Sequence, residues 1–176
     1  SPFPTPDGDV GPSSVANAAS TDGSVIVGAA NSDASGPEGS EAFRWFDGTM
    51  VGLGDLPGGE FRSGARALSG DGSTIVGEAT TDNGTAAFIW DSAHGMRDLQ
   101  SVLAGEFGLD LTGWTLTTAA GISADGTVIV GNGINPNGDY EGFRAVLPEP
   151  ATFFLALLMA AAVSRKRRKE CRTDFP

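Results

Sequence analysis

A nine-residue motif occurs three times in this chain of 176 residues, and it constrains the fold more than any other feature. Its form is Ser-x-Asp-Gly-Ser/Thr, followed by two β-branched residues and then by Val and Gly. The copies lie at residues 20–28, 69–77 and 123–131, so the spacing is 49 and then 54 residues. Each copy is followed by an aromatic segment, at residues 41–45, 86–90 and 141–145. Repeats of this length predict a series of similar folded units.

Each unit is predicted to contain about four short antiparallel strands. Asp-Gly between apolar flanks favours a tight hairpin, because Gly adopts positive φ angles and Asp tolerates them. The β-branched run favours a strand. Aromatic residues two apart, such as Phe43 and Trp45, fall on one face of the next strand. Two units add a further apolar strand, at residues 50–56 and 96–99.

One such sheet cannot bury its aromatic face alone, so the units are expected to stack. The predicted fold is all-β and β-propeller-like, with three units at residues 16–147, because a four-stranded unit of about 50 residues has the size of a propeller blade. Propellers usually have four or more blades. We therefore expect either a partial or open arrangement or a chain trimmed at its N-terminus, with residues 1–15 disordered or truncated. A short helix is expected at residues 99–104.

The repeats resemble the HAF family of extracellular repeats. The resemblance rests on the Ala-Phe-Arg-Trp strand at residues 42–45 and on the Ser-x-Asp-Gly-Ser-x-x-Val-Gly hairpin, and it covers about residues 16–147. The third copy departs from the pattern, because Ala145 replaces the tryptophan and the fourth strand is missing. The resemblance supplies no catalytic residue.

The C-terminal segment, residues 148–176, has a different organisation. Pro148, Glu149 and Pro150 precede an uncharged apolar run at residues 151–163. Ala, Leu and Met favour a helix, and a helix that is apolar on every side requires lipid or complete burial. We therefore predict a transmembrane helix at residues 151–164. Five consecutive basic residues follow it: Arg165, Lys166, Arg167, Arg168 and Lys169.

The predicted helix is short for a bilayer. At about 1.5 Å per residue it reaches ~20 Å, whereas the hydrocarbon core is ~30 Å thick. Snorkelling of Arg and Lys side chains and local thinning of the bilayer would compensate. The basic cluster would place the C-terminus in the cytoplasm, with everything before Pro148 outside it. The alternative is a C-terminal helix in the protein core, followed by a solvated basic tail.

Pro-Glu-Pro, an apolar helix and an Arg-rich end resemble the PEP-CTERM protein-sorting domain, over about residues 147–169. In that family the tail is recognised by exosortase, an integral-membrane cysteine transpeptidase-like enzyme. The resemblance implies that the tail is removed and that the protein is released to, or attached at, the cell surface. HAF repeats commonly accompany such tails. The short apolar run and the extra residues 170–176 depart from the pattern and bear on the efficiency of processing.

The body of the chain is strongly acidic. Residues 1–150 contain five arginines, no lysine and twenty acidic residues, a net charge of −15. Such a body repels nucleic acid and anionic lipid, so no nucleic-acid partner is expected. The only cysteine, Cys171, lies beyond the basic cluster, so the body forms no disulfide. A secretion signal is expected at the N-terminus of the full precursor.

No catalytic residue, cofactor or metal site is predicted. His94 is the only histidine and lies in a predicted turn, so neither a metal pair nor a Ser-His-Asp arrangement is indicated. Residues 7–9 and 135–139 carry oxygen ligands but lack the EF-hand pattern. The glycine motifs that bind phosphate or dinucleotides are absent. Turn geometry explains the repeated aspartates Asp22, Asp71 and Asp125.

The aromatic residues of the repeats are expected to pack as core between adjacent sheets. These residues are Phe43, Trp45, Phe88, Trp90 and Phe143. Trp114 lies outside the repeat pattern, in a loop, and is the candidate for ligand contact. Cys171 is a candidate for lipid modification, but it is expected to belong to the removed tail.

Two functions fit these features. The first is an exported, non-enzymatic repeat protein of the cell envelope or extracellular space, anchored transiently in the membrane and recognised by an exosortase-type protease. The second is a secreted polysaccharide-binding lectin or glycan-active enzyme. The tail, together with repeats that share no reactive residue, favours the first.

Overall fold

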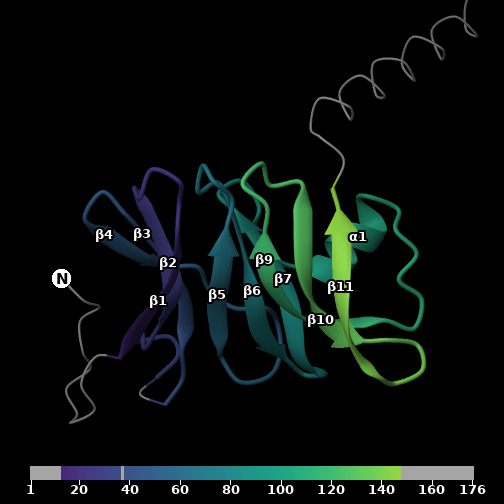
Figure 1. Cartoon of the computed structure of the whole chain (residues 1–176). Helices are drawn as coiled ribbons and strands as arrows, with labels where there is room; N and C mark the ends of the chain where they lie inside the picture. Colours follow the sequence, from purple (N-terminus) through teal and green to yellow (C-terminus); the bar gives the residue numbers. More distant parts are fainter. Residues whose placement is uncertain (1–12, 37, 148–176) are drawn as a thin grey trace, which may run out of the picture.

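The computed structural model describes residues 13–36 and 38–147. They form three antiparallel sheets and one short helix, so the all-β prediction is confirmed (Figure 1). Within these residues the sheets close into neither a barrel nor a propeller. The C-terminal helix predicted at residues 151–164 lies outside them.

The three sheets follow one another along the chain, and each is an up-and-down meander (Figure 1). The first contains β1 (Ser14–Ala19), β2 (Val25–Ala30), β3 (Glu41–Phe46) and β4 (Thr49–Gly52). The second contains β5 (Ser63–Leu68), β6 (Thr74–Thr81), β7 (Gly84–Asp91) and β8 (Gly95–Asp98). The third contains β9 (Thr115–Ile122), β10 (Val128–Ile134) and β11 (Tyr140–Val146), and no fourth strand of it lies within the described residues.

The fourth strands of the first two sheets end earlier than the sequence predicts. They end at Gly52 and Asp98 rather than at residues 56 and 99, because the chain turns there toward the next element. Helix α1 (Leu99–Gly105) begins directly after β8, which confirms the short helix expected at residues 99–104. Asp98 is its N-cap, and its carboxylate accepts a hydrogen bond from the N–H of Ser101 at 2.7 Å.

The repeated motif closes the hairpin between the first two strands of every sheet. In the first copy, Asp22 Oδ1 accepts hydrogen bonds from the Ser20 hydroxyl at 2.7 Å and the Ser24 hydroxyl at 2.8 Å. The Ser20 hydroxyl in turn accepts from the N–H of Val25 at 2.9 Å. The same bonds form around Asp71 and Asp125. Turn geometry thus explains the repeated aspartates, as predicted.

The glycine that ends each motif lies beneath an aromatic ring of the neighbouring strand. The cross-strand pairs are Gly28 with Phe43, Gly77 with Phe88, and Gly131 with Phe143. A Cβ added to Gly77 would lie 2.8 Å from the Phe88 ring and 2.1 Å from the carbonyl oxygen of Gly64. Only glycine therefore fits at this position of the motif.

Apolar side chains fill the space between consecutive sheets. One cluster joins Val25 and Val27 of β2 to Ile75 and Phe88 of the second sheet. The other joins the opposite face of the second sheet, including Val76, to the third sheet and α1. Each sheet therefore covers the same face of the sheet before it.

The repeated aromatic residues are distributed between these clusters and an outer face. Phe88, Trp90 and Phe143 pack in or against the clusters between sheets, as predicted. Phe43 and Trp45 alternate with residues that face the second sheet, so they lie on the far face of the first sheet. The prediction that they pack between sheets is wrong for the described residues, because no described sheet precedes the first one. Phe43 is nevertheless 2% exposed, so the burial expected of a core residue is confirmed for it, whereas Trp45 is half-buried.

Main-chain hydrogen bonds also connect the turns of consecutive sheets. The N–H of Thr21 donates to the carbonyl of Gly70 at 2.8 Å, and the N–H of Gly70 donates to the carbonyl of Ala124 at 2.8 Å. These three residues occupy the same position of the motif. The turn ladder, as we call these two bonds, fixes the register of each sheet on the next.

We expect the charges of the turn aspartates to stabilise the fold. The hydroxyl of Ser20, followed by the N–H and hydroxyl of Ser24, lowers the pKa of Asp22 to about 2. Equivalent bonds, led by the hydroxyls of Ser69 and Ser123, lower the pKa of Asp71 and of Asp125. A carboxylate with a lowered folded-state pKa contributes stability above its unfolded pKa of about 3.9, and this contribution is lost as the pH falls through the folded pKa.

A triple Asp→Asn variant at these turns keeps acceptor oxygens and removes the charges. Its melting temperature should lie a few degrees below that of the wild type at about pH 7, and the difference should shrink toward zero near about pH 2. Melts followed by circular dichroism measure this difference. A difference that stays constant with pH would contradict the electrostatic explanation.

The substitution Gly77→Ala tests the glycine beneath the Phe88 ring. The added methyl should lower the free energy of unfolding by about 1–3 kcal/mol, because the ring and the strand must move apart. Gly105→Ala, at the end of α1, is the control, since a Cβ there meets nothing within 4 Å. Urea unfolding should show that this control is neutral or slightly stabilising.

Candidate functional site

A groove of about 890 Å³ lies beside the second sheet and α1. It is formed by the loop after β4, the β6–β7 hairpin, β8, α1 and the start of β9. Concave surfaces that combine apolar walls with a few polar groups are the usual sites for small ligands. Its lining includes Leu56, Met96, Arg97, Gln100, Glu106 and Leu116.

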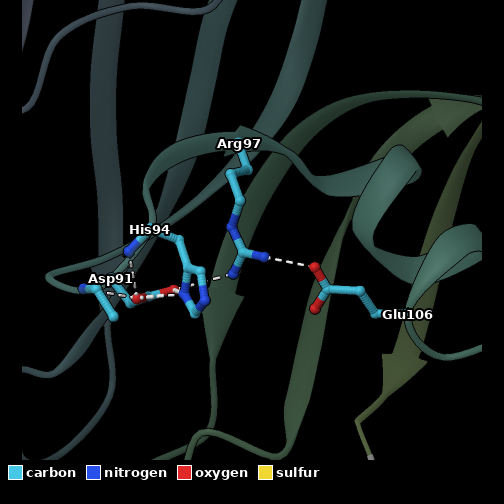
Figure 2. Close-up of polar contacts among 5 residues, drawn as sticks. Asp91, His94, Arg97 and Glu106 are labelled. Carbon is cyan, nitrogen blue, oxygen red and sulfur yellow. Dashed lines mark hydrogen bonds and ion pairs between the residues drawn. The ribbon is translucent and has the colours of Figure 1, made fainter.

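Four charged or titratable side chains form a network at this groove (Figure 2). Arg97 donates to Asp91 Oδ2 at 2.9 Å and to Glu106 Oε1 at 2.6 Å. His94 Nδ1 lies 2.8 Å from Asp91 Oδ1 and 3.0 Å from Oδ2. The network connects the β7–β8 turn to the C-terminal end of α1.

Local sequence sets this geometry. Asp91 ends β7, and its Oδ1 accepts the N–H groups of Ala93 and His94 at 2.9 and 3.0 Å, as short polar side chains do in tight turns. Gly95 adopts a φ of 73° and starts β8. Arg97 then points across β8 toward the helix, where Glu106 is the C-cap.

The charges of this network compensate one another. Partial burial acts to raise the pKa of Asp91, but the hydrogen bonds from His94 and from the N–H of Ala93 outweigh it, so the pKa is lowered. Arg97 is held between two carboxylates, and its Nε is buried without a partner among the described residues. The groove therefore offers polar contacts but no uncompensated positive charge for an anion.

The network does not form a catalytic triad. Among the described residues, no Ser, Thr or Cys side chain is hydrogen-bonded to His94, although a nucleophile next to the base is what a triad requires. His94 lies in a turn, as predicted, with its side chain largely exposed. The arrangement holds the turn against α1 and could contact a neutral, hydroxyl-bearing ligand.

No described group of three or more His, Cys, Asp or Glu residues could hold a metal ion. The oxygen-rich segment 135–139 forms the β10–β11 turn, where Asn135 Oδ1 accepts the N–H groups of Asn137 and Asp139. The three motif aspartates belong to three separate turns and each serves its own hairpin. The oxygen ligands of residues 135–139 and of the three motifs are thus used within turns.

Trp114 lies next to a second, smaller hollow of about 300 Å³. The tryptophan is half-buried against the cluster between the second and third sheets. Its carbonyl accepts a hydrogen bond from Gln100 Nε2 at 2.8 Å, and Gln100 Oε1 accepts the N–H of Leu116 at 3.0 Å. One side of the hollow carries Glu141 and Arg144. The candidate ligand residue therefore lines a concave surface with charged neighbours.

Sequence reasoning missed the Arg97 groove, although a signal was present. Arg97 and Asp98 occupy the positions of Val51 and Gly52 in the first unit, as the cross-strand pairing shows. A charged pair in place of an apolar residue and a glycine marks a departure from the repeat. The partner Glu106 follows no repeat position, so only the fold brings it to Arg97.

Several predicted site residues lie outside the described residues. They are Asp7, Gly8, Asp9, Cys171, the sorting motif Pro148, Glu149 and Pro150, and the basic residues Arg165, Lys166, Arg167, Arg168 and Lys169. No protein-family model matches the chain, and no curated protein matches it either.

The hypothesis that the hollow binds polysaccharide makes a specific prediction about Trp114. Trp114→Ala should lose retention on a carbohydrate array, because the aromatic wall of the hollow is removed. Phe46→Ala is the matched aromatic control, since Phe46 is 46% exposed and does not line the hollow. Melting curves, with Trp114→Phe as a milder change, separate lost binding from lost folding. No retention of the wild type on any glycan would contradict the hypothesis.

Proposed function

We propose that the chain is an exported, non-enzymatic repeat protein of the cell surface or extracellular space. The observation that carries this proposal is the use made of the shared residues of the repeats. The motif serines and aspartates hold hairpins, and the motif glycines accommodate aromatic rings. What is repeated in this chain therefore serves the fold, which suits a scaffold or interaction module.

We further propose that the three sheets are the β-propeller-like units expected of HAF-type repeats, as part of a partial ring or of an open stack. The support is the repeated geometry: each sheet covers the same face of the preceding sheet, and the turn ladder keeps the same position of each motif in register. Stacked units of this kind present extended surfaces rather than one deep pocket.

The proposed route to the surface rests on the C-terminal sequence. Residues 148–176 would act as a sorting tail held in the membrane through residues 151–164 and recognised by an exosortase-type protease. The described residues contain no helix with the length and apolar character needed to cross a bilayer. The proposal therefore depends on the apolar run and the basic cluster, and on an acidic body suited to solubility.

Polysaccharide binding is the second candidate function. The observation that favours it is the hollow beside Trp114, which combines an aromatic wall with a carboxylate and a guanidinium. It would make the chain a secreted lectin or a glycan-active enzyme. The array experiment with Trp114→Ala distinguishes it from a purely structural role.

Processing of the tail tests the primary proposal. In the cells that naturally make the protein and its sorting protease, intact-mass measurement should find protein that ends near Pro150. Glu149→Ala should retain residues up to Pro176 and stay in the membrane fraction, because the recognised signature is altered. Glu170→Ala changes an acid of the same tail beyond the basic cluster, and it should behave as the wild type. Protein found in the cytoplasm with an intact C-terminus would refute the proposed route.

A further inference from the structure

The outer face of the third sheet carries exposed apolar side chains, with Arg144 opposite Val130 among them. Cross-strand pairing places Val130, Ile134, Tyr140 and Val146 on this face, and these side chains are all exposed. Val130 occupies the repeat position of Val27 and Val76. Those two valines are 0% exposed because the next sheet covers them, whereas Val130 is 45% exposed. The third sheet thus presents the face that the first two sheets bury.

The first sheet presents the complementary face. Ile26 occupies the repeat position of Ile75 and Ile129, which are 0% exposed because each packs against the preceding sheet. Ile26 is only half-buried, and Trp45 beside it is half-buried too, whereas Phe43 and Ala30, farther along the same face, are 2% and 3% exposed. The accessible part of this face is therefore the end next to the Asp-Gly turn. The described residues therefore carry the valine half of the internal contact at one end of the series and, at the other end, the accessible part of the isoleucine half around Ile26 and Trp45.

The turn ladder ends at the same two places. Within the described residues, the N–H of Ala124 donates to no carbonyl, although the equivalent groups of Thr21 and Gly70 each donate to the next turn. At the other end, no described N–H donates to the carbonyl of Thr21, although the carbonyls of Gly70 and Ala124 each accept such a bond. Among the described residues, an unpaired donor thus lies beside the exposed face of the third sheet, and an unpaired acceptor beside Ile26 on the first.

We propose that a second copy of this chain docks through these faces, with its first sheet on the third sheet of its neighbour. The contact repeats one that the fold already makes twice. The valine position of one sheet packs against the isoleucine position of the next, and here the N–H of Ala124 donates to the carbonyl of Thr21 of the second copy. Such a contact joins two different surfaces. Two copies form a closed pair if the rotation between sheets brings both contacts together, and an open series if it does not.

A second copy is the occupant that the observations specify. The uncovered face of the third sheet is the counterpart of faces that, in this chain, are buried by another sheet of the same repeat. The turn ladder requires that the docked sheet carry the same turn motif, and it also sets the register of that sheet. An unrelated apolar partner would explain the exposed valine but not an unpaired N–H at the motif position that links the sheets.

Sedimentation equilibrium of the full chain, in a mild detergent matched in density to the solvent, tests the contact. The wild type should show concentration-dependent association, and Val130→Asp should weaken it at least about tenfold in Kd. Val51→Asp is the control, because Val51 is 57% exposed but lies on neither proposed face. Association that Val130→Asp leaves unchanged, or a wild type that stays monomeric at about 0.1 mM, would overturn the proposal.

A second substitution removes only the main-chain donor. Ala124 is the second residue of a turn closed by the N–H of Gly126 on the carbonyl of Ser123, a position that favours proline in common turns. Ala124→Pro should therefore fold normally, with an unchanged melting temperature, and still weaken association severalfold. A properly folded Ala124→Pro protein with wild-type association would contradict the role given to the turn ladder.

Mixing variants determines which surfaces meet. Ile26→Asp alone should impair association as Val130→Asp does, because each variant damages one half of every contact. A mixture of the two restores one intact contact, between the third sheet of the Ile26→Asp copy and the first sheet of the Val130→Asp copy. Recovery of dimer in the mixture is expected. Normal association of Ile26→Asp alone would show that third sheets pair with each other and would overturn the proposal.

Discussion

The contact between opposite faces of consecutive sheets is the interaction on which the rest of the structure depends. A sheet of three or four short strands is too small to cover its own apolar face and must pack that face against another element. Val27 and Val76 become fully buried only because a following sheet covers them. The turn ladder and the glycine positions are consequences of this need, since they bring the sheets to a fixed register and allow the strands within a sheet to approach closely.

The sequence predicts the local structure well and the contacts between sheets only in part, since Phe88, Trp90 and Phe143 pack there as expected. Asp-Gly hairpins, β-branched strands and the helix after residue 98 follow from preferences of neighbouring residues, and each forms where expected. The side of a sheet that is covered depends on residues about 50 positions away, so Phe43 and Trp45 were placed between sheets although they lie on an outer face. The pairing of Arg97 with Glu106 was equally inaccessible, because α1 and the β7–β8 turn bring the two together.

Residues that the units share and residues in which they differ have separate roles. Shared serines, aspartates and glycines are fully used by turns and close strand contacts. Residues that depart from the repeat pattern, such as Arg97, Asp98 and Trp114, cluster around α1 and the loop before β9. They line both hollows of that region. A repeat fold can change such positions without disturbing the contact between sheets, so this region is where a ligand preference would evolve most easily. The hollow beside Trp114 is therefore the better place to look for recognition than any repeated position.

The two proposals, a membrane-held tail and head-to-tail docking of copies, support one another physically. A tail in the bilayer confines the chains to a surface, and confinement raises their effective concentration and favours contacts too weak to form in dilute solution. The acidic body opposes association through mutual repulsion, which the salt of an extracellular medium screens over about 10 Å. Docked copies would share one register through the bond from Ala124 to Thr21, so release of the tail would free an assembly rather than single chains. Order in the assembly would then be set by the same contact that orders the sheets within one chain.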